Sequence, residues 1–201
     1  MKFSTNYPVD FSQRTASDET DPIFVNRWSP RSFRKVEIPQ GILDSIFDAA
    51  RFAPSCFNDQ PWLIVTSSGA EDFDRFLKLL NEANQVWAKN AGLIGFIFAR
   101  KHFAHNGQPN RWANFDCGSA WMSLALQTAM HGLHAHGMAG INYDLVHKEL
   151  GVREEDYQSV CGFALGLIDR PDALPEDYAK RESPSPRQPL DKIWHRGKYL
   201  E

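Results

Sequence analysis

The chain has 201 residues, 42% of them hydrophobic and 23% charged, which is the composition of one globular domain with a buried core. Its net charge of -3 gives no bulk electrostatic reason to bind nucleic acid or an anionic membrane. Three cysteines (Cys56, Cys117, Cys161) are an odd number without a CxxC spacing, which argues against a disulfide framework and a zinc site.

The first 22 residues are polar and show little periodicity, so they are expected to form an extended arm. They contain no apolar signal-peptide region, and no apolar run approaches the roughly 20 residues of a membrane span. We therefore expect a cytoplasmic protein with a single domain over residues 1–201.

Hydrophobic residues recur at helical spacing from Pro39 to Phe52, which predicts a helix with one buried face that Pro54 ends. The run Trp62–Thr66 is rich in β-formers and predicts a buried strand. The elements expected next are a helix over 73–81, a strand over 93–99 and a turn-rich loop over 105–110.

A long, mostly apolar stretch from Asp116 to His136 predicts the central buried helix. The elements expected after it are a short helix over 144–150, a strand over 160–167 and an extended tail over 169–201. The tail holds five prolines and exposes Trp194 and Tyr199, so a partner subunit is one candidate for what it lies on. Strands and helices alternate without a βαβ rhythm, which favours the α+β class.

The common catalytic signatures are missing from the sequence: it has no GxGxxG after a strand, no Walker A loop and no GxSxG elbow. The histidines fall into two groups, His102 with His105 and His131 with His134 and His136. No carboxylate or cysteine lies at a helpful offset from them, so we interpret them as core or surface residues and predict no metal site.

Three polar segments could bind a ligand. In the first, Arg27–Phe33, two arginines flank a serine ahead of a helix, a pattern that suits a phosphate group. In the second, Ala53–Trp62, amides and hydroxyls crowd between a helix and a strand and could read the edge of a heteroaromatic ring. In the third, Gly137–Asn142, small residues would let the backbone approach a ligand closely.

Each segment also has an ordinary structural interpretation. Arg27–Phe33 could be a solvated basic turn, Ala53–Trp62 a capped helix-to-strand turn, and Gly137–Asn142 a helix C-cap. The order and spacing of the three segments make the set more specific than any one of them.

Together these segments resemble the nitroreductase family. The family's Arg-x-Ser-x-Arg-x-Phe motif is matched by Arg27, Ser29, Arg31 and Phe33, and its Ala-Pro-Ser-x-x-Asn-x-Gln-Pro-Trp motif by Ala53, Pro54, Ser55, Asn58, Gln60, Pro61 and Trp62. The helix after Asp116 is similar to the family's central helix, Asn110, Arg111 and Trp112 before it resemble one subgroup, and Arg187–Leu190 matches an Arg-x-Pro-Leu element. The resemblance covers about residues 24 to 196.

The resemblance implies a mixed, mostly antiparallel sheet wrapped by helices, in an intertwined homodimer with two FMN molecules at the interface. Arg27, Ser29, Arg31 and Arg187 would bind the phosphate and ribityl chain, while the Ser55 loop would come from the other subunit. The backbone at Ala139 and Gly140 would approach flavin N5. The implied cofactor-binding set is Arg27, Trp28, Ser29, Arg31, Pro54, Ser55, Cys56, Asn58, Gln60, Met138, Ala139, Gly140 and Arg187.

The sequence departs from the family pattern at three places. Ala139–Asn142 stands where many members have Gly-Gly-Phe-Asp, although a contact through the backbone amide tolerates alanine. Ser185 replaces a basic residue that often precedes the C-terminal arginine by two, which implies a less positive phosphate site. Trp28 fills a position that is often Arg or His.

The function implied is an FMN-dependent oxidoreductase that reduces nitroaromatics, quinones or similar acceptors with NAD(P)H by a ping-pong mechanism. No side-chain acid or base is required, so no catalytic side chain is assigned. Trp87, Phe103 and Trp112 either line the acceptor face or belong to the core. The alternatives are a specialised reductase of the same fold (enone reduction, dehalogenation or flavin fragmentation), a flavin-binding sensor or storage protein, and a flavin-free interaction domain.

Overall fold

One long strand, β5, organises the sheet in this computed structural model, which describes residues 2–5 and 7–199. β3 pairs along one side of β5 and carries β2 at its outer edge, while β4 and β1 pair one after the other along the opposite side. All of these pairings are antiparallel. The strands are β1 (Phe33–Arg34), β2 (Trp62–Thr66), β3 (Leu93–Arg100), β4 (His134–Met138) and β5 (Tyr157–Ile168).

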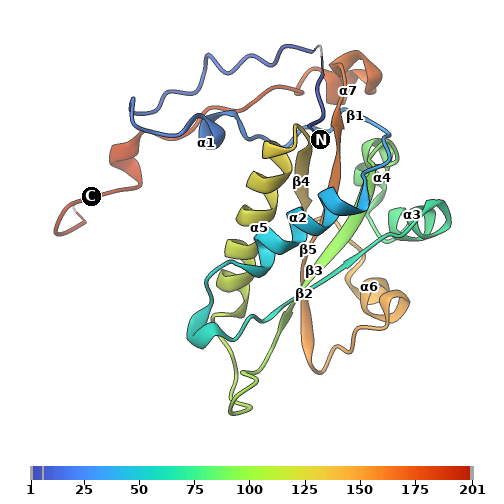
Figure 1. Cartoon of the computed structure of the whole chain (residues 1–201), viewed down its shortest axis with the longest axis vertical. Coiled ribbons are helices and arrows are strands. Elements are labelled where there is room, and N and C mark those ends of the chain that lie inside the picture. The colour runs from blue at the N-terminus through green and yellow to red at the C-terminus, as the bar shows by residue number, and fades with distance from the viewer. Residues whose placement is uncertain (1, 6, 200–201) are drawn as a thin grey trace.

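Helices cover both faces of the sheet (Figure 1). The α-helices are α1 (Pro22–Asn26), α2 (Gln40–Arg51), α3 (Ala70–Leu77), α4 (Glu82–Ala88), α5 (Ala113–Met130), α6 (Tyr143–Leu150) and α7 (Glu176–Ala179). Short 3-10 turns are η1 (Cys56–Asn58), η2 (Pro171–Ala173) and η3 (Leu190–Lys192). The expected α+β class with a largely antiparallel sheet is confirmed.

Two hydrophobic cores lie on opposite faces of the sheet. On one face, α2 and α5 pack together and bury Ile46, Leu124 and Phe163. On the other, α3, α4 and α6 bury Phe76, Trp87 and their neighbours. Because β3 contributes to both cores, its side chains are buried on both faces from Leu93 to Ala99. No helix in the described residues is long and apolar enough to cross a bilayer.

The central helix is shorter than the sequence predicts. Residues 116–136 were expected to be helical throughout, but α5 ends at Met130 and β4 begins at His134. Gly132 separates them with a φ of +76°, a left-handed conformation that glycine adopts without strain. The apolar residues of 133–138 therefore belong to a strand that pairs with β5. In one continuous apolar run, the sequence pattern alone does not distinguish such a strand from a continuation of the helix.

The other expected elements are largely confirmed. The observed bounds of α2, β2, β3 and α6 match the predictions within one residue, and β5 extends the predicted strand at both ends. The helix expected over 73–81 was wrong beyond Leu77, because Asn81 caps a separate helix, α4, by accepting a hydrogen bond from the Asn84 amide at 3.0 Å. The sequence analysis also missed α1, β1 and β4, and the tail expected to be extended over 169–201 contains α7, η2 and η3.

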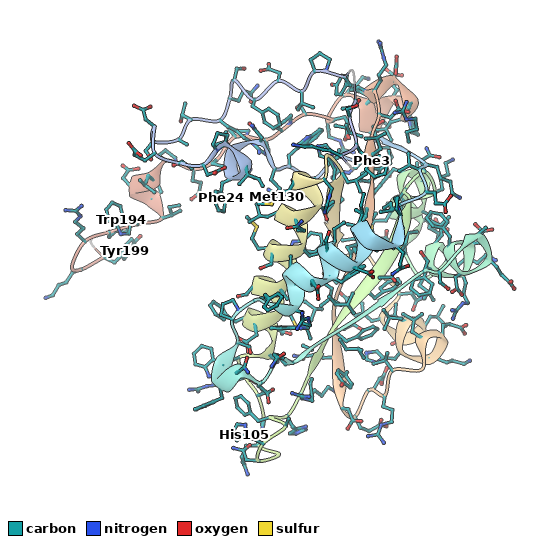
Figure 2. The ribbon with its side chains drawn as sticks, in the orientation of Figure 1. Phe3, Phe24, His105, Met130, Trp194 and Tyr199 are labelled. Atoms are coloured by element: carbon teal, nitrogen blue, oxygen red, sulfur yellow. The ribbon has the colours of Figure 1, made fainter. Side chains whose placement is uncertain are left out.

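The C-terminal tail runs away from the sheet and its helices (Figure 1). Residues 185–199 are all exposed, and Figure 2 shows Trp194 and Tyr199 at the far end of the tail. The side chains of Leu190, Ile193 and Trp194 are more than half exposed. Within the described residues, nothing in the same chain covers these apolar groups.

Replacing Gly132 with alanine should destabilise the fold by about 1–3 kcal/mol, because a Cβ there would lie 2.0 Å from the Phe3 carbonyl oxygen on a left-handed backbone. Gly41→Ala in α2 is the matched control, since that position has open space and helical geometry, and it should be neutral or slightly stabilising. Urea unfolding of both variants measures the difference. Equal stability for the two would contradict this account of how α5 ends.

Candidate functional site

Five arginine side chains converge on one pocket of about 380 Å³. Its lining residues are Arg14, Arg27, Trp28, Ser29, Arg31, His136, Arg181, Ser183, Ser185 and Arg187. Four of the predicted phosphate-binding residues, Arg27, Ser29, Arg31 and Arg187, are thus brought together, although Arg187 lies 160 positions further along the chain than Arg27. The lining contains no carboxylate, so it offers donors and positive charge and few acceptors.

The turn that carries these arginines is fixed from two sides. The buried Glu182 accepts the Arg31 and Ser32 backbone N–H groups on Oε1, at 2.6 and 2.7 Å. From β4, the His136 Nδ1 lies 2.8 Å from the Pro30 carbonyl oxygen and donates to it. The backbone of Arg27–Ser32 is therefore held before any ligand arrives, and only the side chains remain to be ordered.

Burial and neighbouring charge keep the histidines of β4 neutral. Burial, aided by the nearby Arg31, lowers the pKa of His136 to about 4, and burial together with Arg27 does the same to His134. Burial also lowers the pKa of Arg27, and the charge of Arg187 adds to that effect. The positive charge of the pocket at neutral pH therefore comes from guanidinium groups, and an anion is the counter-charge that it lacks.

A second cavity of about 430 Å³ shares Arg27 and Trp28 with the arginine pocket and reaches the C-terminal end of α5. Two buried ring nitrogens at its edge, Trp28 Nε1 and His134 Nδ1, have no hydrogen-bond partner among the described residues. Trp28 is 4% exposed and lies between the two cavities. A charged side chain at this buried position would need a partner of opposite charge, whereas the indole ring of Trp28 does not.

The second predicted segment forms a tight loop after α2 that includes η1. Phe57, Asn58 and Gln60 all have positive φ, between 47° and 54°, a strained conformation for residues other than glycine. Ser55 Oγ accepts the Gln60 backbone N–H at 3.0 Å and closes the loop on itself. Asn58 and Gln60 remain exposed, as does Phe57, whose ring is 80% exposed.

Asp59, which the sequence analysis did not single out, holds this strained loop in place. Its carboxylate accepts hydrogen bonds from the Ala104 backbone at 2.8 Å, Arg100 Nη2 at 3.0 Å and Asn110 Nδ2 at 3.1 Å. Burial alone would raise the pKa of Asp59, but these hydrogen bonds and the Arg100 charge outweigh it and lower the pKa. The loop is thereby fastened to the end of β3 and to the turn beyond it.

Asp116 fastens the same loop to α5. Its Oδ2 accepts the Cys56 backbone N–H at 3.1 Å, and the residue is only 2% exposed. Burial raises the pKa of this carboxyl group, and the neighbouring Asp59 charge adds to the rise. Pro54, Ser55 and Cys56 are thus carried at the N-terminal end of α5.

The third predicted segment is the end of a strand and the turn after it, so the helix C-cap interpretation was wrong. Met138 is buried in β4, and Ala139 and Gly140 follow it. The Ala139 carbonyl oxygen accepts the Ile141 N–H at 3.0 Å and the Tyr143 hydroxyl at 3.1 Å, which fixes the orientation of the Ala139–Gly140 peptide plane. Within the described residues the Gly140 N–H, on the opposite side of that plane, has no acceptor.

Two asparagine side chains crowd the backbone at Gly140, so a larger residue there would have to displace them. A Cβ on Gly140 would lie 2.3 Å from Asn81 Nδ2 and 2.7 Å from Asn84 Nδ2. Asn142, a departure from the family pattern, caps α6 by accepting the Leu145 N–H at 3.2 Å. Asn142 thus has a structural role in this chain.

A single chain does not bring the arginine pocket and the Ser55 loop together. The loop contacts α5 at Asp116, whereas α1 and the pocket region lie near Met130 at its other end, as the neighbouring labels Phe24 and Met130 indicate in Figure 2. Fourteen residues of helix separate these points, which corresponds to about 21 Å. The predicted site residues therefore form two separate groups in this structure.

Of the three aromatic residues considered for the acceptor face, Trp87 is a core residue. It is 1% exposed and its ring lies against Phe33 and His136. Phe103 packs against Phe57 beside the Ser55 loop, and Trp112 is 45% exposed at the start of α5. In residues 2–5 and 7–199, no three His, Cys, Asp or Glu side chains converge as metal ligands.

Comparison with known proteins decides what this arrangement is. The model of the nitroreductase family matches residues 25–89 and 70–167, most of the chain. The chain belongs to the nitroreductase family. A solved structure described as an oxidoreductase containing FMN is 39% identical, covers 100% of this chain and 99% of its own, and superposes with a TM-score of 0.89.

Two further relatives show how wide the family is. A nitroreductase family protein from Clostridium difficile 630 has the same fold, with a TM-score of 0.68 at 19% identity over 88% of this chain and 97% of its own. A CLA biosynthesis enone reductase from Lactiplantibacillus plantarum is 25% identical over 75% of this chain and 85% of its own. The resemblance drawn from the sequence motifs is confirmed at the level of family and fold.

The buried histidines of this nitroreductase-family protein should make its fold acid-labile. His134 and His136 have folded-state pKa values of about 4, below the ordinary value of 6.5, so the unfolded chain takes up protons first as pH falls. Stability present above pH 6.5 is lost between pH 6.5 and 4, by up to about 3 kcal/mol per histidine. His136→Asn should flatten the slope of unfolding free energy against pH, and an unchanged slope would refute the assignment.

Asp59→Ala should lower the free energy of unfolding by about 2–4 kcal/mol, because it leaves Arg100 and the Ala104 N–H without their buried acceptor. Asp156→Ala is the control: Asp156 pairs with Arg153 at an exposed site, and its loss should cost under about 1 kcal/mol. Thermal unfolding compares the two. Similar losses would mean that Asp59 is not the anchor of the loop.

Proposed function

We propose that this protein is an FMN-dependent oxidoreductase that works as a homodimer and uses NAD(P)H to reduce electron-poor acceptors such as nitroaromatics and quinones. The observation that carries the proposal is the carboxylate-free pocket of five arginines beside His136 of β4, together with the acceptor-free Gly140 N–H in the turn that follows this strand. The 39% identical structure, described as containing FMN, supports the choice of cofactor.

The arginine pocket suits the phosphate of FMN. A phosphate monoester carries up to two negative charges and only acceptor oxygens at neutral pH, and guanidinium groups bind such oxygens in pairs. Arg27, Arg31 and Arg187 would hold the phosphate, with the Ser29 hydroxyl as a neutral donor. His136 of β4 lies at the pocket, and Gly140, in the turn after the strand, follows four residues later, a span of about 13 Å in extended chain.

A second copy of the chain would supply the other group of site residues. The face of α5 that is not packed on the sheet exposes Phe115, Met122 and Met130, and the projecting tail exposes Leu190 and Trp194. Apolar surface of this extent on a soluble chain favours burial against a partner. In such a dimer, Ser55, Cys56 and Asn58 of one subunit would complete the flavin site of the other, with Gln60 nearby.

FMN held by these residues would supply the redox chemistry that connects the reduced nicotinamide to the acceptor. The contribution of the chain is to bind, orient and polarise. The Gly140 N–H, fixed by the hydrogen bonds on the Ala139 carbonyl, would donate to N5. The arginine charges would hold the phosphate end of the cofactor. No side-chain acid or base is assigned.

The first test is an absorption spectrum of the purified protein before and after anaerobic addition of NADH or NADPH. Flavin bands that bleach on addition, and that recover with a nitroaromatic or a quinone, are the expected result. Bleaching without acceptor-dependent recovery would favour a flavin-binding sensor or storage protein. Protein that neither contains nor binds FMN would refute the proposal.

Mixed dimers test whether the site is shared between subunits. In a dimer of one Arg27→Ala chain and one Asn58→Ala chain, both substitutions would fall in one site and leave the other intact. We expect each homodimeric variant to lose FMN at least about tenfold more readily, and the differently tagged heterodimer to retain about half the wild-type flavin. If both residues served the same site within one chain, the heterodimer would have no intact site, and its flavin content would match that of the single variants.

The enone reductase relative makes a specialised acceptor worth testing directly. Steady-state rates with a nitroaromatic, a quinone and an α,β-unsaturated ketone, at matched reduction potential, compare the candidates. A kcat/KM that is at least about tenfold higher for the enone would assign the specialised reaction to this chain.

A further inference from the structure

Arg14 joins three segments around the arginine pocket, although it comes from the N-terminal arm and matches none of the sequence motifs. Its Nη1 donates to the carbonyl oxygens of Val25 at 2.7 Å and Arg27 at 2.9 Å. Its Nε donates to the Ser185 carbonyl oxygen at 3.0 Å. The guanidinium thus bridges the end of α1 and the tail segment that carries Arg187.

The guanidinium of Arg14 also faces the pocket itself. It lines the cavity together with Arg27 and Arg187, and its Nη2 has no hydrogen-bond acceptor among the described residues. Burial lowers the pKa of Arg14, and the charges of Arg187 and Arg27, which line the same pocket, lower it further. Without an anion, this arrangement is repulsive.

No carboxylate lines the pocket beside Arg14, Arg27 and Arg187 in the part of the chain that the structure describes. Glu182 is buried behind the turn, where its Oε1 is occupied by the Arg31 and Ser32 backbone N–H groups, and it does not line the pocket. His136, the remaining titratable group there, is neutral at pH 7 because burial lowers its pKa to about 4. The counter-charge for Arg14, Arg27 and Arg187 must therefore come from a ligand.

We propose that Arg14 binds the flavin phosphate through its free Nη2, and that phosphate binding thereby holds the N-terminal arm against the pocket. This inference rests on the proposed function, since it assumes that the pocket takes the phosphate of FMN. Ser185 stands where the family pattern often has a basic residue. Arg14 would supply positive charge at that place, because its Nε donates a hydrogen bond to the Ser185 carbonyl oxygen. The arm would then be part of the cofactor site.

Riboflavin separates this role from a merely structural one, because it has the same ring and ribityl chain but no phosphate. The measurement is the Kd of the full-length, flavin-stripped chain for FMN and for riboflavin, followed by flavin fluorescence. Arg14→Met should weaken FMN at least about tenfold, as expected for one charge-assisted hydrogen bond, and change riboflavin less than about threefold. Arg14→Lys, which keeps the charge but cannot reach three carbonyls, should retain most of the preference for FMN.

Arg153→Met is the matched control, since Arg153 is exposed and pairs only with the neighbouring Asp156. It should leave both dissociation constants unchanged. If Arg14→Met weakened FMN and riboflavin equally, or neither of them, Arg14 would be a structural brace and the inference would be wrong. Wild-type protein that binds neither flavin would instead refute the proposed function itself.

Limited proteolysis gives a second readout that does not depend on the variants folding well. In wild-type protein, FMN should slow cleavage within residues 2–21 at least about threefold, and riboflavin should not. Equal protection by both flavins would show that the arm responds to the ring and not to the phosphate, which contradicts the inference.

Discussion

Helix α5 sets the geometry on which the rest of the site depends. It carries the Ser55 loop at its N-terminal end, through the Asp116–Cys56 hydrogen bond, and its C-terminal end lines the cavity that adjoins the arginine pocket at Arg27 and Trp28. A straight helix cannot shorten, so these two groups stay roughly 20 Å apart in any one chain. A ligand that needs both groups must recruit the second from another copy, and the apolar side chains on the outer face of α5 give a second copy a reason to bind there.

The electrostatics of the pocket follow from what surrounds it. Glu182 uses its carboxylate on backbone N–H groups behind the turn, which orders the arginine-bearing segment without neutralising its side chains. The β4 histidines are too buried to carry charge at neutral pH. The pocket therefore combines a rigid backbone with cationic side chains that lack a counter-charge. An anion should bind to such a pocket favourably, because little of the protein has to be reorganised.

The sequence predicted the parts of this protein that are local. Trp62–Thr66 and Gln40–Arg51 lie where propensity placed them, because each depends on neighbours within about ten residues. The predictions failed where a distant contact decides the outcome. Gly132 ends α5 beside the Phe3 carbonyl group. Asp59 can be recognised as an anchor only once the fold places Ala104 and Asn110 beside it. Arg14 reaches a pocket whose other lining residues lie up to about 170 positions away in the sequence. Spacing within a motif carries no information about such partners.

The strained loop after α2 is fixed in a conformation that suits contact with a second copy of the chain. Phe57, Asn58 and Gln60 adopt left-handed backbone conformations that cost about 1–3 kcal/mol each, and the Asp59 carboxylate and Asp116 hold them there from opposite sides. Asn58 and Gln60 are exposed, and the Gln60 amide donates to the Asn58 carbonyl oxygen at 3.1 Å within the loop itself. Two buried acids thus fix a strained loop whose residues face outward. This is consistent with a loop that contacts a ligand bound to another subunit, because its geometry would already be correct when the subunits associate.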